Sequence, residues 1–322
     1  MSEKGEGRRH GAGRLICRVL VAAGGVVSGL TLAGFASGLW WPLELVCHFR
    51  MQYLVALAAI ALALVLLRTA RAAGVFAVFC AVNLALIVPF YIAPAGGGSF
   101  VPLRAMMINV HTANRGAGVV KAAIGKYNPD FLLLLEVDAW WLLALDDLSD
   151  AYPYSIKRPR SDNFGIALFS KVPFVNVEIV TLGAAGVPSV AAEVLFEGSP
   201  FTVFGTHPLP PVGADYARLR NEQLAAAAEF VRGVDSPVLL LGDLNITQWS
   251  HFFHRLLGEA GLHDSSPGHG FQPTWPVHNV LLRVPIDHCL YSDGIKIVDR
   301  QVGPDVGSDH YPLIVDFAVS RR

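Results

Sequence analysis

The sequence predicts a mixed-sheet α/β domain that follows three transmembrane helices. Three nearly uncharged apolar blocks precede residue 94, and the remaining chain has a more mixed composition. Beyond residue 104, short apolar runs typical of buried strands alternate with helical patterns, and several strand patterns follow one another directly. Crossover units combined with hairpins give a sheet with parallel and antiparallel strands, covered by helices on its outer faces.

The apolar blocks account for the first 94 residues. The chain is 53% hydrophobic and only 16% charged, and the blocks cover about 15–40, Met51–Leu67 and Ala73–Ala93. Each block approaches the roughly 20 apolar residues that cross a bilayer core, although the second is short. A cleaved signal peptide is the alternative for the first block, but that block is longer than a usual signal sequence and two more follow it.

Basic residues predict how the blocks are oriented. They gather in the N-terminal tail and in the second connection, as Lys4, Arg8, Arg9, Arg14, Arg68 and Arg71. The positive-inside rule places both regions in the cytoplasm, so three crossings put the chain after Ala93 on the far side. We therefore expect a multi-pass protein of the plasma (inner) membrane, with the lipid bilayer as a partner and an extracytoplasmic domain. No protein partner is identifiable from the sequence.

The chain then divides into a membrane region (1–94), a linker (95–103) and a domain (104–322). The segment "PAGGGS" at 94–99 has the Gly and Ser content of a flexible linker. In the domain, apolar runs bounded by Gly, Pro, Asn or Asp predict strands, and Ala and Leu at helical spacing predict helices. Predicted strands cover 105–111, 130–137, 165–171, 174–182, 189–196, 201–207, 237–245, 287–292, 295–302 and 312–319, and predicted helices cover 117–127, 139–148 and 214–233.

Polar side chains interrupt these apolar strands at their ends. They are Asn109, Glu136, His207, Asp243, Asn245, Asp287, and the pair Asp309 and His310 before the last strand. Any one of them has an innocent explanation as a helix cap or a turn residue. As an ordered set they indicate a shared site, because active-site groups in layered α/β proteins collect where strand ends and loops converge.

In this order the residues resemble the endonuclease/exonuclease/phosphatase (DNase I-like) superfamily. The segments "GDLN" at 242–245 and "SDHYPL" at 308–313 carry most of the resemblance, and "NFGIALFSK" at 163–171 adds to it. The resemblance spans about 104–317 and implies a four-layer sandwich of two packed mixed β-sheets flanked by helices. It implies hydrolysis of a phosphodiester, in a nucleic acid or in a phospholipid or sphingolipid, by metal-assisted attack of an activated water.

The resemblance also implies roles for the polar residues. Asp243 orients or deprotonates the attacking water, and Asn245, two residues along the same strand face, donates to the developing negative charge. His207 protonates the leaving group or contacts the phosphate. His310 contacts the phosphate or assists proton transfer, and Asp309 orients its ring.

The metal and substrate positions follow in the same way. Glu136, with Asn109 beside it, is the expected metal ligand, because a carboxylate, an amide oxygen and waters suit Mg²⁺ (or Mn²⁺) better than zinc. Asp287 is expected to be another metal-side or histidine-supporting carboxylate. Asn163 and Trp275 are expected to contact the substrate.

Three alternatives remain open at this stage. The domain is either an enzyme or a catalytically inert binding module on the same fold. The membrane segment is either an anchor or the functional part of a transporter, although paired intramembrane charges are absent from the pattern. Arg218 and Arg220 either approach a substrate phosphate or belong to a surface helix.

Overall fold

The structure, a computed structural model, describes residues 3–92 and 102–320. The chain forms two compact units, which we call unit 1 (Met1–Pro89) and unit 2 (Phe90–Arg322). Most of the predicted linker, up to residue 101, lies outside the described residues, and Leu103 already begins the first strand.

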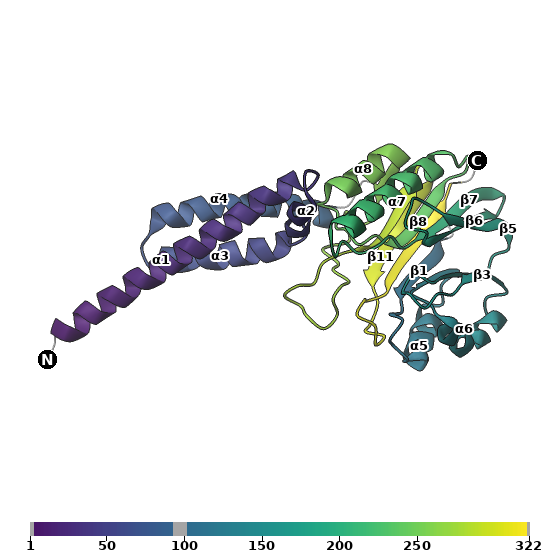
Figure 1. Cartoon of the computed structure of the whole chain (residues 1–322), viewed down its shortest axis with the longest axis horizontal. Coiled ribbons are helices and arrows are strands. Elements are labelled where there is room, and N and C mark those ends of the chain that lie inside the picture. The colour runs from purple at the N-terminus through teal and green to yellow at the C-terminus, as the bar shows by residue number, and fades with distance from the viewer. Residues whose placement is uncertain (1–2, 93–101, 321–322) are drawn as a thin grey trace. The chain divides into compact units, whose positions relative to one another are not determined.

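Unit 1 is helical and contains α1 (Glu3–Ala33), α2 (Trp41–Cys47), α3 (Arg50–Leu66) and α4 (Ala70–Ile87) (Figure 1). Among the described residues, two helices are long and apolar enough to cross a membrane, over Ala12–Ala36 and Ala70–Tyr91. A third crossing requires α2 and α3 to count as one span with a 62° bend. The reason is length, because 17 residues of α3 rise about 26 Å, less than the roughly 30 Å bilayer core.

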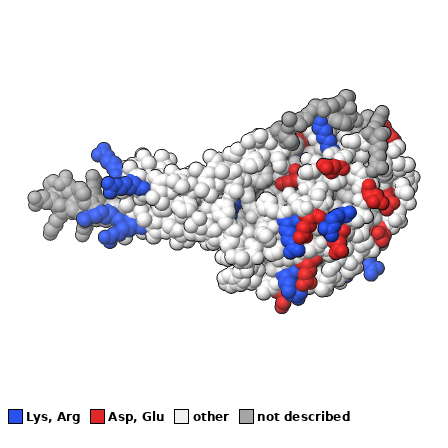
Figure 2. All heavy atoms as spheres, turned by 90° about the horizontal axis from the view of Figure 1, so that it is seen from above, with Lys and Arg blue, Asp and Glu red and all other residues white. Residues whose placement is uncertain are grey.

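The helices of unit 1 bury a small core and expose much apolar surface. Leu57 and Leu64 of α3 pack with Ala73 and Phe76 of α4, and α1 contributes partly buried side chains to the same cluster. Apolar side chains on the outside of all three helices are more than 50% exposed, among them Leu15, Val19, Val55, Leu62, Val75 and Val78. On the face that Figure 2 shows, Lys and Arg gather at one end of this unit, and few other charged side chains are visible on it.

Unit 2 is a sandwich of two six-stranded sheets. The first sheet has the order β11 (Ile295–Val302), β12 (Leu313–Val319), β1 (Leu103–Asn109), β2 (Phe131–Leu135), β4 (Ile166–Ser170), β3 (Tyr154–Arg158). The second has the order β5 (Phe174–Thr181), β6 (Pro188–Phe196), β7 (Ser199–Thr206), β8 (Val238–Asp243), β10 (Asp287–Ser292), β9 (Leu262–Asp264). The inner faces share one apolar core, in which Phe201 contacts Phe131 at 5.6 Å and Phe317 at 5.8 Å between ring centroids.

Helices cover the two outer faces, as Figure 1 shows. Helices α5 (Ala117–Tyr127) and α6 (Ala139–Ala144) pack on the first sheet, and α7 (Ala214–Arg232) and α8 (His251–Ala260) pack on the second. The result is helix, sheet, sheet, helix. The prediction of two packed mixed sheets flanked by helices is confirmed.

Strand direction brings the polar strand ends together. Strands β1 and β2 are parallel, as are β7 and β8, and the other neighbouring strands are antiparallel. Parallel strands end at the same edge, so Asn109 and Glu136 meet above the first sheet, and His207 and Asp243 meet above the second. Strand β10 runs antiparallel to β8 and begins at Asp287, directly opposite Asp243.

Candidate active site

Asp243 lies at the centre of the polar strand ends and is 1% exposed. Its Oδ1 accepts a hydrogen bond from the backbone N–H of Asn245 at 3.0 Å, and its Oδ2 accepts one from Nδ2 of Asn109 at 3.2 Å. The same Oδ2 lies 3.4 Å from Nε2 of His207 and 3.5 Å from Nε2 of His310. One buried carboxylate therefore joins groups from both sheets.

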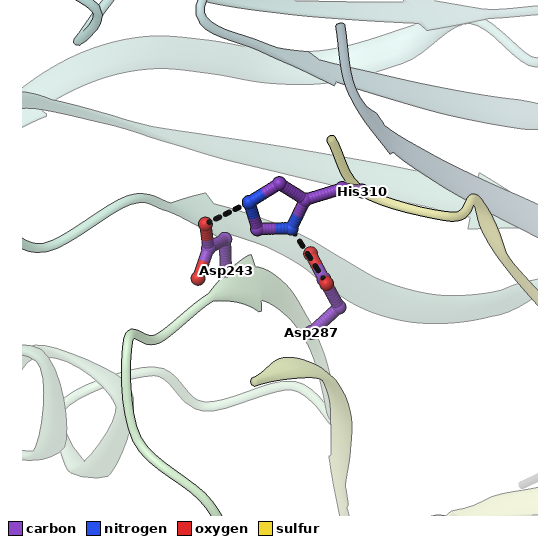
Figure 3. Close-up of side chains that lie close together, drawn as sticks. All are labelled: Asp243, Asp287 and His310. Atoms are coloured by element: carbon purple, nitrogen blue, oxygen red, sulfur yellow. Dashed lines mark hydrogen bonds and ion pairs between the residues drawn. The ribbon is translucent and has the colours of Figure 1, made fainter. Parts of the chain in front are cut away.

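His310 lies between two carboxylates (Figure 3). Its Nδ1 lies 2.9 Å from Oδ2 of Asp287, and its Nε2 faces Asp243. Asp309, which the sequence analysis expected to orient this ring, accepts instead from the indole N–H of Trp275 at 3.0 Å. The turn causes the difference, because Ser308 Oγ donates to the carbonyl of Asn109 and accepts from the backbone N–H of His310. The histidine then faces inward and its neighbour does not.

The charges of this group stabilise one another. Burial raises the pKa of Asp243, but His310 and His207 outweigh it and lower that pKa to about 2. Burial lowers the pKa of His310, but Asp287 and Asp243 outweigh it and raise that pKa to about 10. Near neutral pH Asp243 is therefore a carboxylate and His310 an imidazolium.

His207 follows β7 and is 4% exposed. Burial lowers its pKa, but the hydrogen bond and the charge of Asp243 outweigh burial and raise it. Its ring packs against Phe164, with 5.4 Å between centroids, and its Nδ1 has no hydrogen-bond partner in the described part of the chain. A ring whose pKa is raised, and whose Nδ1 is unused, is suited to contact an anion.

Glu136 lies directly after β2 and is half-buried. Its backbone has a positive φ of 62°, which its neighbours hold in place: Thr112 Oγ1 donates to the carbonyl of Glu136, and the backbone N–H of Thr112 donates to Oε2. Nδ2 of Asn109 donates to Oε1 at 2.9 Å, while Oδ1 of Asn109 accepts from the backbone N–H of His111. Each carboxylate oxygen of Glu136 therefore keeps a lone pair for a further partner.

Arg220 is a positioning residue that sequence analysis did not identify. Instead of approaching a phosphate or lying on a surface, it is fully buried on the inner face of α7 and donates to the carbonyl of Asn245 at 3.0 Å. That carbonyl belongs to a residue in left-handed backbone, with a φ of 54°. Helical spacing could have predicted its burial, because Arg220 lies on the same buried face of α7 as Ala217 and Leu224. Arg218 is exposed and pairs with Glu222.

We expect the variant Arg220→Met to lose about 2 kcal/mol of unfolding free energy, because a charged hydrogen bond disappears and the Asn245 carbonyl loses its donor. The midpoint of thermal unfolding should fall by roughly 4–8 °C. Circular dichroism in detergent measures this shift. Arg218→Met is the matched control and should change the midpoint little, because its ion pair is exposed. Equal effects of both variants would contradict the role assigned to Arg220.

The two expected substrate contacts lie at the rim. Asn163 is exposed in the loop before β4, and it is the next residue, Phe164, that touches His207. Trp275 is 37% exposed, and its ring lies 6.2 Å from that of His310. The structure therefore brings Trp275 to the site and leaves Asn163 at its edge.

The pKa of His310 predicts a pH effect. Its folded value of about 10 lies above the ordinary value of 6.5, so the charged ring stabilises the fold at low and neutral pH, and this is lost as pH rises through about 10. Asp287→Asn removes one of the two carboxylates and should lower that pKa by roughly 1–3 units. The alkaline limb of kcat/KM should move down by the same amount. Asp293→Asn, at a carboxylate 99% exposed, should leave the limb in place; an unmoved limb in both variants would contradict the assignment.

Comparisons with known proteins agree with this geometry. Residues 108–310 match the model of the Endonuclease/Exonuclease/phosphatase family. No curated protein matches the chain. The human nocturnin catalytic domain with bound sulfate has a similar structure, with 20% identity over 69% of this chain and 97% of that one, at a TM-score of 0.57.

Two further solved structures are similar. Humanized D. rerio TDP2 shares 17% identity over 68% of this chain and 99% of that one, at a TM-score of 0.57. Sphingomyelinase C from Streptomyces griseocarneus shares 18% identity over 67% of this chain and 99% of that one, at a TM-score of 0.52. These identities show a common fold. The family match covers more than half of the chain and includes the whole set of polar strand ends, so the chain belongs to the endonuclease/exonuclease/phosphatase family.

Proposed function

We propose that the chain is a membrane-anchored phosphodiesterase that hydrolyses its substrate by attack of a water held at Asp243. The observation that carries this proposal is the buried Asp243 carboxylate between two histidine rings, at the edge where both sheets end. A water bonded to Asp243 lies beside donors suited to an anionic phosphate. This arrangement supports hydrolysis of a phosphoric ester, the reaction class of the family.

A divalent cation completes the proposed site, with Mg²⁺ (or Mn²⁺) as the ion. Glu136 would hold it, since its half-buried carboxylate has lone pairs to spare and water reaches it. The bound ion would neutralise charge on a phosphate oxygen. Asp243, Asp287 and His310 also have ligand atoms within 4.8 Å of one another. Both nitrogens of His310 already face those carboxylates, so we assign the cation to Glu136, with Asn109 bracing it.

The remaining side chains transfer protons and stabilise negative charge. A carboxylate with a pKa of about 2 is a weak base, so Asp243 orients the water and takes its proton only as the water becomes acidic in the transition state. The imidazolium of His310 and the second amide N–H of Asn245 stabilise charge on the phosphoryl oxygens. His207, whose pKa is raised and whose Nδ1 is unused, donates to the leaving group.

We further propose that unit 1 crosses the membrane three times and places the domain outside the cytoplasm. Exposed apolar side chains on α3, such as Val55 and Leu62, support a lipid-facing helix. Arg68, between α3 and α4, supports a cytoplasmic connection. A periplasm-active reporter enzyme fused after residue 320 should be active, and one fused at Arg68 inactive. The reverse result would contradict this topology, either because the bent pair α2–α3 does not cross or because the orientation is inverted.

The experiment that tests the function measures hydrolysis of bis-p-nitrophenyl phosphate by the full chain in detergent. We expect turnover with Mg²⁺ or Mn²⁺, and loss of it when a chelator removes the metal. Recovery on adding the metal back excludes denaturation as the cause. A folded chain without turnover on this diester, on DNA or on sphingomyelin would point to the inert binding module. Solved relatives include TDP2 with a single-strand DNA product and a sphingomyelinase, so both substrate classes belong in the assay.

A further inference from the structure

An exposed apolar turn lies beside the candidate active site. Val280, Leu281 and Leu282, which we call the apolar tip, are 70%, 76% and 50% exposed. They lie in the connection between β9 and β10, drawn in yellow-green in Figure 1. Consecutive large apolar side chains in water are unfavourable, and such a patch marks an interaction surface.

The apolar tip is held in shape by its own backbone. Asn279 makes a turn, since its Oδ1 accepts from the backbone N–H of Leu281 at 3.1 Å and its carbonyl accepts from that of Leu282 at 3.2 Å. Below the turn, Trp275 and Val284 pair as an antiparallel bridge. This turn holds the side chains of Val280, Leu281 and Leu282 exposed to solvent.

The base of this turn is joined to the catalytic residues. The backbone N–H of Val277 donates to the carbonyl of Asp309 at 2.9 Å, and that of Tyr311 donates to the carbonyl of Thr274 at 3.0 Å. Both bonds flank His310. A surface that binds the apolar tip is consequently placed next to the phosphate-handling groups.

The same connection is also tied to the end of a membrane span. Phe90 belongs to unit 2 and lies in the candidate span Ala70–Tyr91. Its ring contacts Trp249 at 5.9 Å and Phe271 at 6.0 Å, and its carbonyl accepts from the backbone N–H of Gly270. Phe271, nine residues before the apolar tip, is thus in contact with one of the last residues of the candidate span.

We infer that the apolar tip inserts into the bilayer that anchors the chain, and that the substrate of the site is a phospholipid in that membrane surface. The inference rests on the proposed phosphodiesterase function and names its substrate class. Three consecutive aliphatic side chains match acyl chains, whereas the backbone of a nucleic acid presents charged phosphates. The reaction needs only water, which adds to phosphorus as the ester bond breaks and yields an alcohol and a phosphomonoester.

Insertion is tested with the full chain in vesicles of phosphatidylcholine, phosphatidylglycerol and sphingomyelin. A polarity-sensitive fluorophore is attached at Leu281→Cys, with Cys17 and Cys80 replaced by alanine and the buried Cys47 and Cys289 left in place. Emission should shift to the blue and be quenched at least twofold by spin-labelled lipids. The matched control is Leu195→Cys, which should report water: this exposed leucine of β6 pairs with Pro200 near the start of β7, whereas His207 follows the end of β7. A label at 281 that reports water overturns the inference.

Substrate class is tested by the pair Leu281→Glu and Leu282→Glu in one chain. Hydrolysis of vesicle phospholipid should fall at least tenfold, while hydrolysis of bis-p-nitrophenyl phosphate stays within twofold. Leu195→Glu should change neither rate. Unchanged lipid turnover in the paired variant, or a parent that cleaves DNA or the small diester but none of the vesicle lipids, overturns the inference. A folded parent that hydrolyses none of the small diester, DNA and the vesicle lipids overturns the proposed function itself.

Discussion

Replacing Asp243 by asparagine should lower kcat/KM on bis-p-nitrophenyl phosphate by about 10³-fold or more, the range of positioned acid–base groups. The amide keeps the shape but loses the charge that faces His207 and His310 at 3.4 and 3.5 Å. It also turns a donor towards groups that donate to this position, including Nδ2 of Asn109. The water then loses its charged acceptor, His207 loses the carboxylate that faces it, and His310 keeps only that of Asp287. Steady-state kinetics with saturating Mg²⁺ measures the loss.

The control for this variant is Asp215→Asn, because that carboxylate is 89% exposed on α7. It should keep full activity. Thermal unfolding separates catalysis from folding: the ionised Asp243 stabilises the fold above its ordinary pKa of 3.8, and that stability is lost as pH falls towards about 2. The activity of Asp243→Asn is therefore measured at a temperature well below the midpoint of its own thermal unfolding. A folded Asp243→Asn chain with a kcat/KM within tenfold of the parent would remove the central claim of the mechanism.

Replacing Glu136 by glutamine should weaken binding of the divalent cation. The substitution removes the charge of the assigned ligand while Asn109 and Thr112 keep their positions. We expect the metal concentration for half-maximal activity to rise at least tenfold and the maximal rate to fall about 10²-fold. Binding of Mn²⁺, followed by electron paramagnetic resonance of the free ion, gives a readout that does not depend on turnover.

Glu193→Gln is the matched control, at an exposed carboxylate on β6 away from the strand ends. It should bind Mn²⁺ as the parent does. If Glu136→Gln also binds normally while Asp287→Asn does not, the cation belongs to the group of Asp243, Asp287 and His310 instead. That result would reassign the metal and leave the family and the fold unchanged.

The sequence predicted the buried strands well because burial leaves a strong pattern. Strand β2 is five consecutive buried apolar residues, and β8 runs apolar until Gly242 and Asp243. Strand β3 was not predicted, since its residues are exposed or half-buried and carry no apolar run. Strand β9 has only three residues. Both are edge strands, where solvent and neighbours share control of the backbone.

Helix α8 was also missed, although its signals are present. Ser250 caps its start by accepting from the backbone N–H of Phe252, and Gly261 ends it in left-handed backbone. Helix α6 was predicted through 148 but ends at Ala144, where a 3-10 turn over Asp146–Asp150 begins. These errors concern covering elements, so they did not disturb the prediction of the sandwich.

At the site, the sequence predicted which residues lie together, but it did not predict which of two adjacent residues faces the site. Asp309 and His310 are adjacent, and nothing in their spacing tells which one faces inward. The orientation of His310 is set by Ser308, whose hydroxyl donates to the carbonyl of Asn109, about two hundred residues away in the chain. The burial of Arg220 likewise depends on the packing of α7 on the second sheet. The prediction of an enzyme of the phosphoric-ester hydrolase class is confirmed by the family match.

The place of β12 in the first sheet bears on when the enzyme becomes active. This strand lies between β11 and β1, and it pairs Phe317 with Leu103 across more than two hundred residues. Contacts between residues so far apart in the chain form late in folding, because the entropic cost of closing a long loop comes first. While a ribosome is still producing the chain, the first sheet lacks an inner strand and His310 has no fixed position. We therefore expect hydrolytic activity only after synthesis has passed β12, and a chain arrested earlier should be inactive.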